Sequence, residues 1–128
     1  MKREVLKSGT PWEDIVGYSR AVKIGNIIEV AGTTAMEEDK VIGIGNVYEQ
    51  THFILSKIEK CLEHFGCSMK DVVRTRMYVT DISQWEEIGK AHGHFFIGIN
   101  PVATMVEVNR LISPDLLIEI EVTAIVSN

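Results

Sequence analysis

The chain has 128 residues, 45% of them hydrophobic and 24% charged, with a formal net charge of −5. This length suits one domain with a buried core, and we expect a single domain over residues 1–128. Because the chain has neither a cluster of Lys and Arg nor a long apolar run, its composition argues against nucleic-acid and membrane partners and favours a cytoplasmic protein.

The first elements predicted along the chain are strands. A short strand is expected at Val5, and residues 20–24 and 27–31 form the two arms of a hairpin. Gly25 and Asn26 between these arms can supply the positive φ angles of a two-residue turn. A long polar loop, over residues 32–45, is expected after the hairpin.

A long helix is predicted over residues 47–65, where apolar residues recur at helical spacing. Asn46 can act as its N-cap, and Gly66 can end it in a left-handed conformation. Cys61 lies on the apolar face of this helix, and its spacing from Cys67 matches neither a redox pair nor a zinc site. We therefore expect a reduced packing cysteine, no metal and no cofactor.

The sequence of the second half of the chain predicts three strands and one helix, which lies between the first two of these strands. Ser83, followed three residues later by Glu86, matches a capping box and starts a helix predicted over residues 84–96. Three strands are predicted in this half, over residues 72–79, 103–110 and 117–126. Helices interleaved with hairpins indicate an α+β fold, with a sheet covered by helices on one face only.

Strand alternation assigns side chains to the two faces of this sheet. The face toward the helices is expected to hold Val106, Val108, Ile118, Ile120 and Val122. The opposite face would collect mostly charged side chains: Arg74, Arg76, Tyr78, Met105, Glu107, Glu119 and Glu121, with Glu29 as a further candidate. Two interpretations of that face stay open, namely a solvated surface with weak cross-strand ion pairs and an interface between subunits.

A series of short motifs over residues 17–126 is similar to one known family. The motifs are Tyr18-Ser19-Arg20-Ala21-Val22, Gly25-Asn26, Ala31-Gly32, Asp71-Val72-Val73-Arg74-Thr75, Phe95-Phe96, Pro101, Val106-Glu107-Val108, Arg110-Leu111 and Ile118-Glu119-Ile120-Glu121. No single motif is specific, but their order and spacing together are. The chain resembles the RidA/YjgF family of imine and enamine deaminases, whose members have also been labelled translation inhibitors or endoribonucleases.

The resemblance implies a chorismate-mutase-like α+β fold with a mixed sheet and two helices on one face. It also implies a homotrimer that binds a small metabolite in clefts between subunits. In active members a tyrosine near the N-terminus packs on the ligand, the backbone after a Ser-Gly turn lines the cleft, and a glutamate on the last strand positions water. The matching positions are Tyr18, Gly32 followed by Thr33, and Glu119.

One expected residue of that family is missing. Active members carry a Pro-x-Arg-Ser sequence whose arginine binds the substrate carboxylate, and it falls here on Pro101-Val102-Ala103-Thr104. The arginine position is therefore Ala103, and a frequent cysteine two residues later is Met105. Alanine cannot bind a carboxylate, and losing such a charge-assisted pair costs substrate binding about 2–5 kcal/mol.

Two residues are candidates to replace the arginine. Arg76 lies on the polar sheet face, although it can also form a structural ion pair with a neighbouring glutamate. His92 stands where the family commonly has a tyrosine, and it can serve as an acid, a base or a donor, or lie on an ordinary helix surface. His92 and His94 are two residues apart on a helix, so their rings point to different faces and we expect no metal site.

Three functions follow as hypotheses. The first is a trimeric protein that binds a small metabolite and has weak or altered imine hydrolase activity because of Ala103. The second is a true imine deaminase in which Arg76 or His92 replaces the arginine and Glu119 handles the water. The third is an endoribonuclease or translation inhibitor, which the acidic charge balance opposes.

Overall fold

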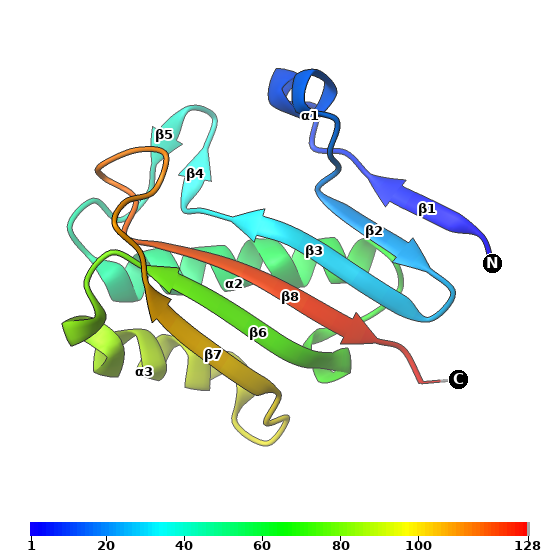
Figure 1. The fold of residues 1–128 in the computed structure, drawn as a ribbon. Coiled ribbons are helices and arrows are strands. Elements are labelled where there is room, and N and C mark those ends of the chain that lie inside the picture. The colour runs from blue at the N-terminus through cyan, green and yellow to red at the C-terminus, as the bar shows by residue number, and fades with distance from the viewer. Residues whose placement is uncertain (128) are drawn as a thin grey trace.

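The computed structural model describes residues 1–127, which form a six-stranded sheet with helices packed on it (Figure 1). The strand order is β1-β2-β3-β8-β6-β7. The strands are β1 (Arg3–Leu6), β2 (Ala21–Ile24), β3 (Ile27–Thr33), β6 (Val72–Val79), β7 (Val102–Glu107) and β8 (Ile118–Ile125). Neighbouring strands are antiparallel except β6 and β7, which are parallel. The predicted α+β fold with a mixed sheet is confirmed.

The hairpin near the N-terminus follows the prediction. Val22 of β2 pairs with Glu29 of β3, and Gly25 in the turn between them has a φ of 61°. Strand β1, predicted at Val5, pairs with β2 at the edge of the sheet. This hairpin continues into a bulge on β3, where pairing with β8 shifts register between Val30 and Thr33.

Two helices, α2 (Val47–His64) and α3 (Trp85–Phe96), cover one face of the sheet, as predicted (Figure 1). Asn46 caps α2 by accepting a hydrogen bond from the Glu49 backbone N–H at 3.0 Å. Gly66 follows its end with a φ of 76°, a conformation that glycine adopts without strain. None of the helices in residues 1–127 is long and apolar enough to cross a membrane.

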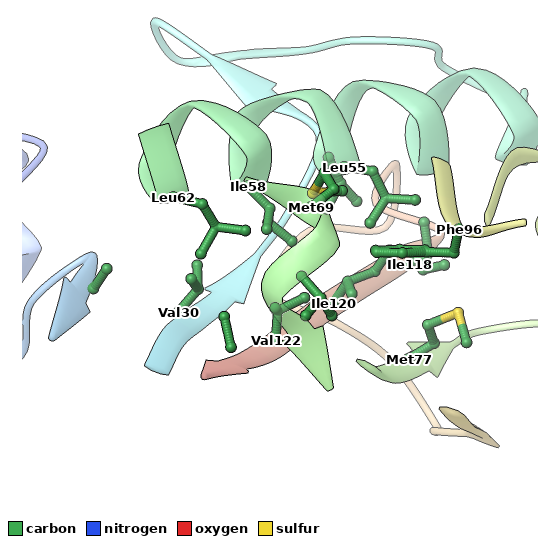
Figure 2. Packing of buried hydrophobic residues seen from close by; sticks show 14 of the residues in the cluster. Val30, Leu55, Ile58, Leu62, Met69, Met77, Phe96, Ile118, Ile120 and Val122 are labelled. Carbon is green, nitrogen blue, oxygen red and sulfur yellow. The ribbon is translucent and has the colours of Figure 1, made fainter. Parts of the chain in front are cut away.

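The core lies between these helices and the sheet. In Figure 2 the side chains of Leu55, Ile58 and Leu62 on α2 point toward Val30, Ile120 and Val122 on the central strands. Leu55, Ile58 and Leu62 are fully buried, and burying a Leu or Ile side chain contributes about 1.5–3 kcal/mol each. The central strands are thus held rigidly from one side, which leaves their other face to carry polar groups.

Three local details differ from the predictions. The polar loop over residues 32–45 contains a small hairpin of β4 (Met36–Glu37) and β5 (Lys40–Val41). A short helix, α1 (Pro11–Val16), precedes β2. The predicted capping box at Ser83 is wrong, because Asp81 instead caps a 3₁₀ turn over Ile82–Gln84 and α3 begins only at Trp85.

The predicted faces of β7 are also wrong. Its parallel register places Met105 beside buried Met77, and Met105 packs against the core under the helices. Thr104 instead lies beside Arg76 on the face without helices, hereafter the open face. Moving the side-chain alternation by one residue exchanges the two faces of a strand, and β7 carries apolar residues at both sets of positions.

Candidate functional site

The first candidate site feature is a close approach between β3 and β8. The carboxylate of Glu119, on β8, lies against Gly32 in the β3 bulge. A Cβ atom at position 32 would overlap Glu119 Oε2, so any other residue there would force the carboxylate to move. Glycine at position 32 therefore allows the carboxylate its present place.

Glu119 lies in an environment that favours its protonated form. Its side chain is about half buried, and this burial raises the pKa of the carboxyl group above its usual value. The Arg20 guanidinium opposes that rise, while the negative charge of Glu121 adds to it. A half-buried carboxylate whose pKa is raised is suited to accept and return a proton.

Arg20 holds the bulge from its other side. Its Nη2 donates a hydrogen bond of 2.7 Å to the Gly32 carbonyl oxygen. Its Nε is buried and, among the side-chain atoms of residues 1–127, is the only buried nitrogen or oxygen without a hydrogen-bond partner. We call Tyr18, Arg20, Gly32 and Glu119 the Glu119 wall.

A shallow depression of about 540 Å³ lies beside this wall on the open face. Its lining residues are Arg3, Gly17, Tyr18, Ser19, Val22, Glu29, Val30, Ala31, Arg76 and Glu121. Arg76 Nε lies 3.8 Å from Glu121 Oε1, and the Tyr78 hydroxyl donates to the same oxygen at 2.8 Å. The Glu121 carboxylate thereby raises the pKa of Tyr78, and it partly neutralises Arg76.

A second group lies at the edge of the sheet under α3. Ala103 of β7 pairs in register with Thr75 of β6, whose side chain is buried toward the helices. Thr75 Oγ1 lies 2.9 Å from Nε2 of His92 on α3. Burial lowers the pKa of His92, which favours its neutral form at pH 7. We call Ala103, Met105, Thr75 and His92 the Ala103 wall.

The structure thus divides the predicted site residues into separate groups. Gly32 and Glu119 are in contact, and Tyr18 and Arg76 line one depression. Ala103, Met105 and His92 lie on the helix side of the sheet, away from those four. A single chain therefore does not bring the Glu119 wall and the Ala103 wall together.

The structure places the side chains of Thr33 and Thr104 apart from those of the other predicted site residues. Thr33 is 1% exposed and its hydroxyl donates to the Ala31 carbonyl oxygen, so its side chain is part of the interior. Thr104 is exposed on the open face, opposite to its neighbours Ala103 and Met105. The alternation of a strand explains the separation, because consecutive side chains point to opposite faces.

The comparison with protein families identifies the chain. The family model described as Endoribonuclease L-PSP matches residues 10–126. The chain belongs to this family. It is the RidA/YjgF family that the sequence motifs resemble, and the RutC proteins are among its members in this comparison.

Two curated relatives and one solved structure illustrate the match to RidA/YjgF proteins. A RutC family protein of Pyrococcus abyssi is 34% identical over 97% of this chain and 98% of its own. The 3-aminoacrylate deaminase RutC of Acinetobacter baylyi is 32% identical over 93% of this chain and 94% of its own. Rv2704 of Mycobacterium tuberculosis, a member of the YjgF/YER057c/UK114 family, is 47% identical, with a TM-score of 0.88 over 98% of this chain and all of that one.

Sequence reasoning missed two residues of this RidA/YjgF protein. Thr75 is polar at a position where strand alternation points inward, and that pattern could have indicated a buried hydrogen bond. Arg20 was noted only as part of a family motif. Its hydrogen bond to the Gly32 carbonyl depends on the β3 bulge, which no local pattern in the chain predicts.

Proposed function

We propose that this chain is a RidA-like protein that binds a small metabolite with a C=N group in clefts between copies of itself. Its imine or enamine hydrolase activity is weak or altered, because the family's carboxylate-binding arginine is Ala103. The observation that carries this proposal is the half-buried Glu119 carboxylate held against Gly32. That group has the chemical character needed to handle water, whereas nothing at Ala103 can hold an anion.

Hydrolysis of an imine needs two proton transfers that one carboxylate can perform. Water first adds to the carbon of C=N, and its proton passes through Glu119 to the nitrogen, which gives a carbinolamine. The hydroxyl proton of that species then passes to the nitrogen in the same way. The C–N bond breaks as C=O forms, so the products are a carbonyl compound and ammonia. The raised pKa of Glu119 makes its carboxylate a better acceptor for the proton of the attacking water.

Clefts between copies of the chain are proposed because the site is divided. The Glu119 wall lies at the open face and the Ala103 wall at the helix side of the sheet edge. A second copy that presents its Ala103 wall to the Glu119 wall of the first would join them. We expect a homotrimer, which multi-angle light scattering would measure as about three times the 14.4 kDa chain mass. A monomer at working concentrations would contradict the cleft between copies.

Weak or altered activity is proposed because the Ala103 wall offers no cation. Ala103 is exposed and has no polar side chain. Burial favours the neutral form of His92, and the hydroxyl of Thr75 shares a hydrogen bond with His92 Nε2. The relative from Acinetobacter baylyi is a 3-aminoacrylate deaminase, which supports an enamine or imine as the class of substrate. Without the arginine, a 2-imino acid would lose about 2–5 kcal/mol of binding energy at this wall.

One assay tests the proposal. An amino-acid oxidase generates 2-iminopropionate in situ, and its disappearance is followed with wild type, Ala103→Arg and Glu119→Gln. We expect wild type to exceed the spontaneous rate by less than about tenfold, Ala103→Arg to gain about tenfold or more, and Glu119→Gln to lose whatever rate wild type adds. Full activity of Glu119→Gln would overturn the role of that carboxylate.

The second candidate function is a true 2-imino acid or enamine deaminase with altered specificity. Arg76 supports it, because it lines the same depression as Tyr18. Its charge is shared with Glu121 at 3.8 Å, whereas His92 is neutral and lies on the other wall. Rapid hydrolysis by wild type that falls in Arg76→Gln would favour this function over the first. An endoribonuclease gains no support from a chain of net charge −5.

A further inference from the structure

We propose that Arg20 is the anion-binding residue of this protein, and that it takes the carboxylate of a short-chain imino or enamino acid beside Glu119. This inference rests on the proposed function and names the residue and the substrate class for its site. The cation that the family carries at the position of Ala103 would then have moved to the Glu119 wall.

The geometry of Arg20 is that of a guanidinium held ready for a ligand. Nη2 donates to the Gly32 carbonyl oxygen at 2.7 Å, which fixes the plane of the group. This one bond uses a small part of its capacity, since a guanidinium carries five N–H donors. Nε is buried without a partner, and leaving a buried donor unpaired costs free energy. A strong acceptor beside the guanidinium would offset that cost electrostatically.

The charge of Arg20 is also not neutralised by a close ion pair. Within residues 1–127, no carboxylate oxygen lies within 4.0 Å of it. Arg20 is close enough to Glu13 to help lower the pKa of its carboxyl group, but both oxygens of Glu13 already accept hydrogen bonds from Ser8. Arg76 differs, because Glu121 lies 3.8 Å from its Nε. Arg20 therefore has the greater capacity for an added anion.

Lys57 adds a second positive charge near Arg20. Its side chain is about half buried on α2, and this burial, together with the charge of Arg20, lowers the pKa of its ammonium group. Lys57 Nζ donates to the Met36 carbonyl oxygen at 2.9 Å, and no carboxylate of residues 1–127 pairs with it within 4.0 Å. The repulsion between Arg20 and Lys57, which the charge of Glu37 partly offsets, would be reduced by a carboxylate bound to Arg20.

The nature of the ligand follows from what lies on the two sides of Gly32. Arg20 binds its carbonyl, and the Glu119 carboxylate covers its Cα. A carboxylate on the guanidinium would set the neighbouring carbons of a short acid toward Glu119, where a C=N carbon could receive water. A long or bulky acid gains nothing from this pair of contacts.

The experiment measures binding of stable ketone analogues by calorimetry to the intact protein. The probes are pyruvate and acetoacetate, with pyruvamide as the uncharged analogue and inorganic phosphate as a different anion. We expect Arg20→Gln to weaken binding of both keto acids by about tenfold or more, because a charge-assisted pair is lost, and to leave pyruvamide unchanged. Arg20→Lys should recover part of the affinity, and Arg74→Gln is the matched control that should retain it, because Arg74 is not among the residues that line the depression.

A second measurement uses wild type, so that it does not depend on how well a variant folds. In protein labelled with ¹⁵N-arginine, the Nε–H resonance absent from Arg20→Lys is that of Arg20. We expect pyruvate to shift it and pyruvamide not to do so. An unshifted resonance, or equal pyruvate affinity in wild type and Arg20→Gln, would overturn the role of Arg20 alone.

Absence of keto-acid binding by wild type would overturn this inference, and absence of imine turnover as well would overturn the proposed function. Tighter binding of phosphate than of either keto acid would overturn the carboxylate assignment.

Discussion

The Glu119 wall and the Ala103 wall differ in how they treat charge. At the first, a half-buried carboxylate lies against Gly32, and a guanidinium with an unpaired buried donor binds the carbonyl oxygen of the same glycine. At the second, Ala103 has no functional group, and His92 is neutral beside the buried hydroxyl of Thr75. Both walls stand on the same rigid sheet, so the difference lies in the side chains and not in the scaffold.

This contrast indicates how a RidA/YjgF scaffold can change its ligand without changing its fold. Burial of Glu119 costs stability, and such a cost is typical of groups that do chemistry. The Ala103 wall carries no comparable cost. We therefore expect substitutions on the Glu119 wall to alter activity more than stability, and those on the Ala103 wall to do the reverse unless they add a charge.

The largest effect is expected from Gly32→Ala. The new methyl group would overlap Glu119 Oε2, but that oxygen is the far end of a flexible side chain and can rotate away. Unfolding free energy should therefore fall by only about 1 kcal/mol, whereas a displaced carboxylate should remove nearly all of the rate that wild type adds to the spontaneous reaction. Imine turnover and thermal denaturation of the same sample measure the two quantities.

Gly89→Ala is the matched control for that substitution. Gly89 lies on α3 one turn before His92, and a Cβ there would meet nothing within 4 Å. Replacing an exposed glycine inside a helix by alanine should stabilise the protein by about 0.5–1 kcal/mol. Equal loss of activity in Gly32→Ala and Gly89→Ala would contradict a special role for the contact between Gly32 and Glu119.

The scaffold could be predicted from the sequence because its signals are local. The Gly25-Asn26 turn, the Asn46 cap and the Gly66 end of α2 each depend on residues a few positions apart. The helical spacing of apolar residues then placed α2 almost to the residue, and the β-branched run placed β6 over Val72–Val79. These rules act on the chain before any long-range contact forms.

The site was harder to predict because its contacts join distant parts of the chain. Strand β7 has apolar residues on both faces, so only its pairing with β6 decides that Met105 points inward. Helix α1 is six residues long, and the side chain that anchors it, Glu13, accepts hydrogen bonds from Ser8 outside the helix. The bond of Arg20 to Gly32 depends on a bulge. The direction of Met105, the anchoring of α1 and the hydrogen bond of Arg20 thus all depend on contacts between separate elements of the fold.

A smaller effect is expected from His92 on the pH dependence of stability. Its pKa is lower in the folded state than in the unfolded state, because burial disfavours the charged ring. The stability that follows is present above the unfolded pKa of about 6.5 and is lost as pH falls through the folded value. His92→Gln removes this titration, so its unfolding free energy should fall less between pH 7 and pH 5.

Denaturant unfolding of wild type and His92→Gln at both pH values measures that difference. Allowing for solvent screening of a partly exposed ring, wild type should lose about 0.5–1 kcal/mol more than the variant. Comparing the change with pH, and not the absolute stabilities, cancels any effect of the lost imidazole on packing. Identical pH dependence in the two proteins would mean that His92 is not held neutral by the fold.

The smallest effect is expected from Glu119→Gln on stability, and its sign is opposite to that of most substitutions. Burial raises the pKa of Glu119 in the folded state, so its contribution to stability is complete below the unfolded pKa of about 4.3 and is lost as pH rises through the folded value. At pH 7 the ionised carboxylate therefore destabilises the fold, and a neutral glutamine avoids this.

We expect Glu119→Gln to raise Tm by about 1–2 °C at pH 7 and by nothing measurable at pH 4. A lower Tm at pH 7 would mean that the attraction of Arg20 exceeds the cost of burial, and Glu119 would then be a structural partner of Arg20 rather than a carboxylate kept for chemistry.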